Sequence, residues 1–300
     1  MPAHGSQARK PLSKPRVIAL MNQKGGVGKT TTTVNLAAAM ALERRRVLVI
    51  DLDPQAHATL HLGIEPAGIQ QSIYDLLLDP SGDSAGAVQR INPTLALIPS
   101  ETDLAAAESE LAAQPDRHQR LVEVLRRVGP AFDVVLIDCP PSLGVLTINA
   151  LACADQVLIP MQAHFLALQG VGKLMETVGL VASGVNPSLT VAGVVLGMHD
   201  ASATLSQEVV ADIESYFELA RGKGLPWSGA QVFKPPVRRN IKLAECPSFG
   251  KSIFDYAPTA SGAADYRALA QAILGETKVP DAPVVVVTEN VAAAPSGATP

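Results

Sequence analysis

The stretch Lys24-Gly-Gly-Val-Gly-Lys-Thr-Thr31 decides the fold of this 300-residue chain. Its second half, Gly28-Lys29-Thr30, ends as the phosphate-binding pattern G-x-x-x-x-G-K-[ST] ends. In that pattern backbone N–H groups surround phosphate, the lysine reaches the β and γ oxygens, and the hydroxyl binds Mg²⁺. The pattern's first glycine would fall at position 23, which holds Gln23, and Lys24 follows it. The loop therefore departs from the ordinary pattern by carrying a second lysine, five residues before Lys29.

The segments on either side of this loop give the order strand, loop, helix. Residues 16–21 form a short apolar run, and residues 30–42 are rich in Ala, Leu and Met without Gly or Pro. A helix that begins at such a loop points its free N–H groups and its positive dipole end at an anion. We therefore interpret the loop as a phosphate site and not as a simple glycine turn. The expected contacts are Lys24, Gly25, Gly26, Val27, Gly28, Lys29, Thr30 and Thr31.

The rest of the chain alternates short apolar runs with helical stretches. The runs are residues 47–50, 95–98, 134–137, 157–160 and 191–196. Continuously apolar strands are buried on both faces, which is typical of parallel sheets. We expect an α/β fold of the P-loop NTPase type in a single domain, with a mostly parallel sheet covered by helices on both faces. Ligands bind such sheets at the carboxyl ends of the strands.

Acidic residues stand at those carboxyl ends. Asp138 follows the run 134–137, and an acid there is the usual partner of the threonine-bound Mg²⁺, directly or through water. A capping or turn role for Asp138 is the alternative. Asp53 is a candidate for orienting the attacking water, or else a turn former before Pro54. The spacing leaves the role of Asp51 open.

Composition limits the other possibilities. With 47% hydrophobic and 17% charged residues, the chain can bury one sizeable core. We expect a flexible basic arm at 1–15, an ATPase domain at 16–276, and a disordered Ala/Pro/Val-rich tail at 277–300. No apolar stretch reaches membrane-spanning length and no secretory signal is recognisable, so a cytoplasmic protein is expected. The three cysteines are widely spaced and suggest buried thiols, not a metal site.

Several motifs in order resemble those of ParA-type partition ATPases, within the ParA/MinD group that shares the two-lysine loop. The resemblance spans about residues 16–274. Besides the loop it includes Asp51-Leu-Asp-Pro-Gln55, Asp138-Cys-Pro-Pro-Ser-Leu-Gly144, Leu146-Thr-Ile-Asn-Ala-Leu151, Ala167-Leu-Gln-Gly170, Arg239-Asn240 and Glu245-Cys-Pro-Ser248.

The resemblance implies an ATPase with ATP and Mg²⁺ as cofactors, in which two subunits enclose two ATP molecules. Lys24 would reach the partner's phosphates, where a cation stabilises transition-state charge. By the same resemblance Lys29 binds phosphate, Thr30 and Asp138 belong to the metal site, and Asp53 activates water. Asn240 would lie near the adenine.

The resemblance also implies nonspecific binding to double-stranded DNA, nucleoid association, and release when a ParB-type partner stimulates hydrolysis. The net charge is −4, but phosphate contacts need only a local basic patch. The sequence offers Lys234, Arg238, Arg239, Lys242 and Lys251, opposed there by Glu245. Of these, Arg238, Arg239 and Lys242 are the expected DNA contacts. A second arginine familiar in the family is replaced by Ser202, which leaves the DNA question open.

Three alternatives differ in what they require. A ParA-like ATPase could position another cargo on the nucleoid, and the sequence does not identify the cargo. A MinD-like membrane ATPase needs a basic amphipathic helix near the carboxyl terminus, which the sequence does not show, so no membrane partner is expected. A reductase or cluster-scaffold ATPase needs paired cysteine ligands, which three scattered cysteines do not supply.

Overall fold

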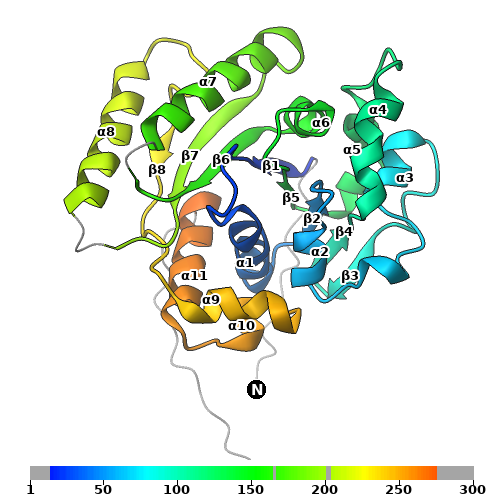
Figure 1. Cartoon of the computed structure of the whole chain (residues 1–300), viewed down its shortest axis with the longest axis horizontal. Coiled ribbons are helices and arrows are strands. Elements are labelled where there is room, and N and C mark those ends of the chain that lie inside the picture. Colours follow the sequence, from blue (N-terminus) through cyan, green and yellow to red (C-terminus); the bar gives the residue numbers. More distant parts are fainter. Residues whose placement is uncertain (1–13, 165–166, 201–203, 276–300) are drawn as a thin grey trace, which may run out of the picture.

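The computed structural model describes residues 14–164, 167–200 and 204–275 (Figure 1). The predicted basic arm, except for its last two residues, and the predicted tail lie outside the described residues, as does Ser202. The domain boundaries at 16 and 276 therefore stay a prediction.

One sheet of eight strands runs through the described residues, in the order β3-β4-β2-β5-β1-β6-β7-β8. All neighbouring strands are parallel except β3 and β4, which are antiparallel. This confirms the predicted α/β fold with a mostly parallel sheet. The strands are β1 (Arg16–Leu20), β2 (Val47–Asp51), β3 (Gln89–Asn92), β4 (Leu95–Ile98), β5 (Val134–Asp138), β6 (Gln156–Met161), β7 (Thr190–Leu196) and β8 (Gln231–Val232).

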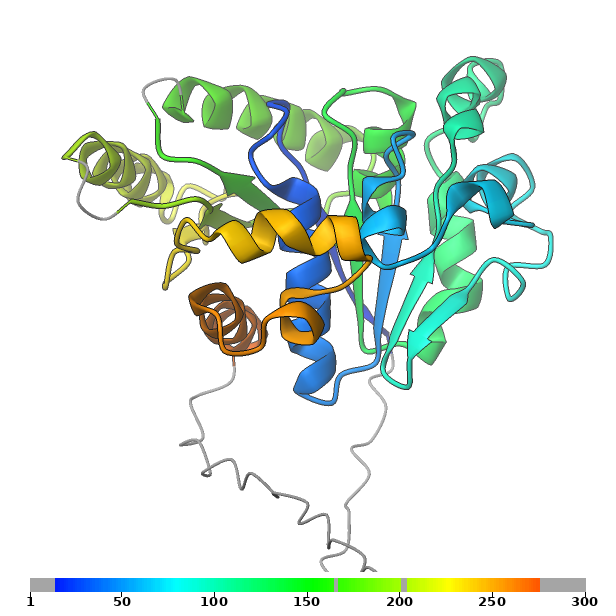
Figure 2. The ribbon, with the colours of Figure 1, turned by 60° about the horizontal axis from the view of Figure 1, so that its bottom comes forward.

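Helices cover both faces of the sheet. The α-helices are α1 (Lys29–Leu42), α2 (His57–His61), α3 (Ile73–Leu78), α4 (Ala107–Leu111), α5 (Arg120–Val128), α6 (Val145–Cys153), α7 (Ala167–Gly184), α8 (Thr204–Ala220), α9 (Ile241–Glu245), α10 (Ile253–Tyr256) and α11 (Ser261–Leu274). Short 3₁₀ turns lie at Pro66–Gly68, Thr102–Ala106, Gly129–Ala131 and Cys246–Phe249. Figure 2 shows α11 and the residues 241–249 beside α1, on one side of the sheet.

The core consists of two clusters, one on each face of the sheet, because successive side chains of a strand point to opposite faces. In β1, Val17 and Ala19 pack with residues of α3 to α8, whereas Ile18 and Leu20 pack with α1, α2 and α9 to α11. Successive side chains of a strand point to opposite faces, so a continuously apolar run supplies both clusters. The apolar runs therefore predicted the buried sheet correctly.

Two strands escape the hydrophobic pattern. β3 has alternating exposure and mostly polar residues, and β8 has only two residues, so neither forms a continuous apolar run. Both lie at the edges of the sheet, where one side of the strand has no neighbour to exclude water. Before α5, a 3₁₀ turn at Thr102–Ala106 is followed directly by the five-residue α4.

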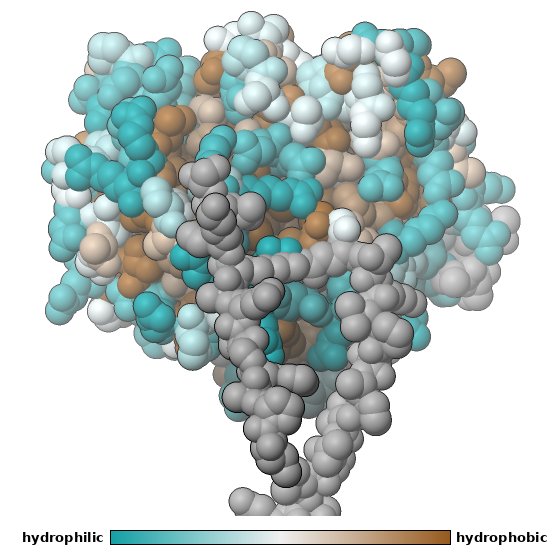
Figure 3. Space-filling view, turned by 180° about the vertical axis from the view of Figure 1, so that it is seen from behind, coloured by the Kyte–Doolittle hydropathy of each residue, from teal (hydrophilic) through white to brown (hydrophobic). Residues whose placement is uncertain are grey.

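Figure 3 shows one face of the molecule, outside the parts that the grey atoms cover. Hydrophilic residues cover most of this face, with hydrophobic residues in smaller areas between them. Within 14–164, 167–200 and 204–275, no helix combines the length and apolar character that crossing a bilayer requires.

Candidate nucleotide-binding site

The predicted phosphate loop joins the carboxyl end of β1 to the first turn of α1. Gly28 occupies the N-cap of α1 with φ of 88°, a left-handed conformation that glycine adopts without strain. Its carbonyl accepts the N–H of Thr32 at 2.9 Å, which closes the first turn. No side chain caps this helix, so its first N–H groups face the loop without a protein side-chain acceptor. Such an end is suited to an anion.

The two lysines of the loop lie in opposite environments. Lys29 starts α1 and is 8% exposed, whereas Lys24 is exposed together with Gly25 and Gly26. Lys29 is close enough to Asp138 for its positive charge to act on the pKa of that carboxyl group, in the lowering direction and against the larger effect of burial. Lys29 therefore belongs to the interior of the site, and Lys24 to its outer surface.

Asp138 is held by two threonines of α1. Thr30 Oγ1 donates to Asp138 Oδ2 at 2.7 Å, and Thr33 Oγ1 donates to Asp138 Oδ1 at 2.8 Å. The carboxyl group is completely buried, and this burial raises its pKa despite the two hydrogen bonds. The predicted pair of metal-site residues thus meets in space across 108 residues of sequence.

A second buried carboxylate, Asp51, organises the loop after β2. Thr59 donates to Asp51 Oδ2 from both its N–H, at 2.8 Å, and its hydroxyl, at 2.7 Å. The N–H of Asp53 donates to Asp51 Oδ1 at 3.2 Å, and Ser100 Oγ donates to the carbonyl of Asp53 at 2.8 Å. Burial, and then the charge of Asp138, raise the pKa of Asp51. Asp51 is therefore a residue that positions Asp53, a role that the spacing left open.

A cavity of about 480 Å³ lies beside the phosphate loop. It joins the loop to residues that are far away in sequence, in the segment after β7, in α9 and in α11, and its walls are largely apolar. Asn240 is one of them, but its side chain is already engaged: it accepts the N–H of Lys242 at 2.9 Å and donates to Ser261 Oγ at 2.8 Å. The lining residues include Val27, Gly28, Thr31, Met198, Val237, Asn240, Leu243 and Tyr266.

A second cavity of about 720 Å³ lies on the other side of the first turn of α1, between α2 and the turn at Cys246–Phe249. His61 is one of its lining residues and is 1% exposed. Nothing in the sequence indicated this residue as part of the site. Burial lowers the pKa of His61 to about 4, and its Nε2 has no hydrogen-bond partner among the described residues. No sequence signal marks this residue, because its burial depends on the turn at residues 246–249 packing over it.

The predicted basic cluster needs a correction. In sequence Glu245 is its opposing acid, but two further acids face it from α8 and α11. The pairs are Lys234 with Glu214 at 3.1 Å, Arg238 with Asp265 at 2.7 Å, and Lys242 with Glu245 at 2.9 Å. Arg238 also donates its backbone N–H to Asp265, which is only 6% exposed. In the described part of the chain, neither Arg239 nor Lys251 has such an ion pair.

The donors at the loop fit a magnesium ion better than a softer metal. Mg²⁺ is usually held by one or two oxygen ligands of the protein, together with water and phosphate oxygens. Thr30 and Asp138 supply a hydroxyl and a carboxylate side by side. In the regions that the structure describes, no three His, Cys, Asp or Glu side chains form a metal-binding group. Cys139 and Cys246 are buried thiols.

This site has a glycine loop between a strand and a helix. A lysine and a threonine begin the helix, and an aspartate ends the adjacent strand. These features define a protein of the P-loop nucleoside triphosphatase class. Comparison with known proteins narrows this class. Residues 15–191 match the family described as an AAA domain. The chromosome partitioning protein ParA of Myxococcus xanthus is 42% identical over 276 residues, covering 91% of this chain and 92% of that protein. The sporulation initiation inhibitor protein Soj of Bacillus subtilis is 43% identical over 262 residues, covering 86% and 98%.

The chain therefore belongs to the ParA/Soj family of partition ATPases, which confirms the resemblance inferred from its motifs. Among solved structures, a protein described as cobyrinic acid a,c-diamide synthase from Mycobacterium smegmatis has the same fold. Its TM-score is 0.73 at 36% identity, with 87% of this chain and 94% of that chain covered. That protein was solved with a bound ATP analogue and magnesium.

Proposed function

We propose that the chain is an ATPase that binds ATP with Mg²⁺ at residues 24–31, dimerises around two ATP molecules, and uses hydrolysis to drive chromosome or plasmid partition. The observation that carries the proposal is the 2.7 Å hydrogen bond between Thr30 and Asp138 at the start of α1. It brings a hydroxyl and a carboxylate together beside a helix end that can bind phosphate. The nucleotide-bound fold relative and the two partition proteins support the same reading.

In this proposal each residue of the site has one task. The N–H groups from Gly25 to Thr31 and the buried Lys29 bind phosphate, and Thr30 and Asp138 hold the metal. The metal supplies charge neutralisation at the phosphates. Asp53, kept in place through Asp51, accepts the proton of the attacking water. The cavity that contains Asn240 takes the adenine, for which its size and apolar walls are suited.

We assign Lys24 to the partner subunit's nucleotide. Its exposure at the outer surface of the loop supports this task, because a lysine that served its own phosphates would need to turn inward as Lys29 does. Exposed apolar side chains near the two cavities support an interface on the same side of the molecule. These are Ile241 at 71% exposure, Phe249 at 60% and Met198 at 45%. Charge from Lys24 would offset the repulsion between two triphosphates.

DNA and a ParB-type activator complete the proposal. Arg239 and Lys251 have charges that no acid neutralises within the described residues, so they are the cations best able to contact phosphate. Arg238 and Lys242 are already paired with Asp265 and Glu245, so DNA phosphate would have to compete with these acids for the two cations. The activator would stimulate hydrolysis and so return the protein from the DNA-bound dimer to single subunits, near the nucleoid.

Two lysine variants test the central step. Lys29→Ala should lose ATP binding, measured by calorimetry, because it removes the buried phosphate ligand. Lys24→Ala should still bind ATP but should not form dimers in light scattering. A Lys24→Ala protein that dimerises with ATP and hydrolyses it at the normal rate would show that the proposed role of Lys24 across the dimer is wrong.

A further inference from the structure

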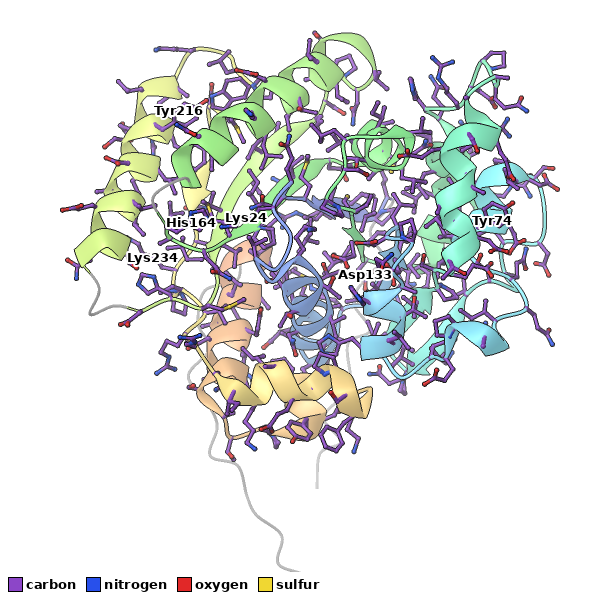
Figure 4. All side chains as sticks on the ribbon, viewed as in Figure 1. Lys24, Tyr74, Asp133, His164, Tyr216 and Lys234 are labelled. Atoms are coloured by element: carbon purple, nitrogen blue, oxygen red, sulfur yellow. The ribbon has the colours of Figure 1, made fainter. Side chains whose placement is uncertain are left out.

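Lys24 has a hydrogen-bonding partner on its own subunit. Its Nζ lies 2.8 Å from Nε2 of His164, which follows β6, 140 residues further along the chain. Figure 4 labels the two side chains and shows them next to each other. A lysine ammonium can only donate, so the imidazole must accept through Nε2 and carry its proton on the other nitrogen.

The contact is part of a larger set between the chain after β6 and the first half of the loop. Pro160 O accepts from Asn22 Nδ2 at 2.9 Å, and Gln162 Nε2 donates to Gly26 O at 3.1 Å. His164 lies two residues beyond Gln162, so three positions of this short segment, 160, 162 and 164, contact the loop at residues 22–26. The Lys24–His164 contact therefore belongs to a set of contacts between this segment and the loop, and is not isolated.

The chemistry of His164 suits an acceptor. Burial, and then the positive charge of Lys24, lower the pKa of His164. The ring is accordingly neutral at neutral pH, which leaves Nε2 with a lone pair for the ammonium.

We propose that His164 holds Lys24 on its own subunit and thereby restrains ATP-dependent dimerisation. The inference rests on the proposed function, in which Lys24 acts across the dimer interface. A contact that forms in the separate subunit and is given up in the dimer weakens the dimer by the strength of that contact. A symmetric dimer gives up two such contacts, so even a modest hydrogen bond has a measurable effect. His164 is thus a positioning residue that acts through Lys24.

The contact itself is tested without nucleotide, by following the imidazole C–H signals of the full chain in an NMR pH titration. The signal of His164 is assigned by its loss in His164→Gln. Replacing Lys24 by Ala should raise the pKa of His164, because a neighbouring positive charge is removed. A His164 titration that is the same in the wild type and in Lys24→Ala would overturn the inference.

The consequence is tested by light scattering of the ATP-Mg²⁺ complex at varied protein concentration. His164→Leu removes the acceptor, and we expect the dimer dissociation constant to fall about tenfold. His164→Gln keeps an acceptor oxygen in a similar place, so it should remain within about threefold of the wild type. An unchanged or weaker dimer in His164→Leu, or a Gln variant that behaves as the Leu variant does, would overturn the inference.

Failure of this inference is distinguishable from failure of the proposed function. If Lys24→Ala still dimerises normally with ATP, the proposed role of Lys24 is wrong. If Lys24→Ala does not dimerise and His164→Leu has the wild-type dissociation constant, only the role of His164 is wrong. The replacement His118→Leu, in the segment before α5, serves as the matched control for loss of a histidine.

Discussion

Asp51 and Asp138 are facing residues of the adjacent parallel strands β2 and β5, and both carboxyl groups are completely buried. The threonine hydroxyls that donate to them come from different helices. Asp138 is bound by threonines of α1, whereas Asp51 is bound by Thr59 of α2. These two acids, at the carboxyl ends of neighbouring strands, therefore have separate tasks. Asp138 contacts the helix that follows the phosphate loop, and Asp51 holds the loop that contains Asp53.

Replacing Thr59 by Val should lower the free energy of unfolding by about 2 kcal/mol, because buried groups lose a hydrogen-bonding partner. The Thr59 hydroxyl donates to Asp51 and accepts the N–H of Ser100 at 2.9 Å. Urea unfolding measures the loss. Thr59→Ser keeps the hydroxyl and is the control, so a Ser variant as unstable as the Val variant would contradict the assignment. ATP turnover should fall in Thr59→Val, since the same contacts position Asp53.

Thr30→Ala should weaken ATP binding in the presence of Mg²⁺ by at least about tenfold, because it removes a hydroxyl from the proposed metal site. Thr30→Ser keeps the hydroxyl and should bind as the wild type does. Calorimetric titration with ATP, with Mg²⁺ and with EDTA, separates the metal-dependent part. Equal losses in both conditions would show that Thr30 does not act through the metal.

Asp53→Ala should retain ATP, accumulate the dimer and hydrolyse at least about 100-fold more slowly, because the base for the attacking water is lost. Phosphate release and light scattering on the same sample give both readings. Asp83→Ala, an exposed acid outside the site, is the control. Rapid hydrolysis by Asp53→Ala would remove Asp53 from the mechanism.

Arg239→Ala should weaken binding of the ATP-loaded protein to random duplex DNA and lower the slope of log affinity against log salt by about 1. Arg126→Ala, an exposed arginine of α5 on the other face of the sheet, is the matched control. Fluorescence anisotropy over a range of salt concentrations measures the slope. A flat salt response of the wild type would take DNA out of the function.

Arg238→Ala should act differently, by lowering the urea midpoint of unfolding. It leaves Asp265 buried without the guanidinium that forms hydrogen bonds with both of its carboxylate oxygens. An Arg238→Ala protein with normal stability and weakened DNA binding would instead assign this arginine to the DNA surface.

His61 predicts a pH dependence of stability. Its pKa in the folded protein is about 4, below the ordinary value near 6.5, so the unfolded chain binds more protons between these pH values. Stability from this group is therefore complete above about pH 6.5 and decreases as the pH falls toward 4, by about 3 kcal/mol at most.

The variant His61→Gln isolates this effect. The raised pKa values of Asp51 and Asp138 act in the opposite direction, but they are shared by both proteins and cancel in the difference. Urea unfolding at several pH values should show the wild type losing stability relative to His61→Gln between pH 6.5 and 4. A constant difference would mean that His61 has the same pKa in the folded and the unfolded protein.

The sequence predicted the parts of this protein that depend on local pattern. The phosphate loop follows from Gly28-Lys29-Thr30, and the parallel sheet follows from continuously apolar strands such as β2 and β5. Asp138 was expected at the metal site because an acid ends a strand there. Its pairing with Thr30 then needs only the known order of strand, loop and helix.

Contacts between distant segments were not predictable in the same way. Arg238 and Asp265 are 27 residues apart, and Lys24 and His164 are 140 apart, with no periodicity that connects them. From the sequence, only Glu245 was expected to oppose the basic cluster, because it is the acid nearby along the chain. The other two acids come from α8 and α11, which are distant in sequence but close in space. Burial of His61 likewise depends on a turn that arrives almost 190 residues later.

The division of β1 between two core clusters has a consequence for the evolution of this chain. Loss or gain of a single residue inside Arg16–Leu20 would move the strand residues on one side of the change to the opposite face of the sheet, and so to the wrong cluster. Substitution of one apolar residue by another does not change which face of the sheet each position points to. Single-residue insertions and deletions in β1 should therefore destabilise the fold more than changes of side-chain size, which repacking can accommodate.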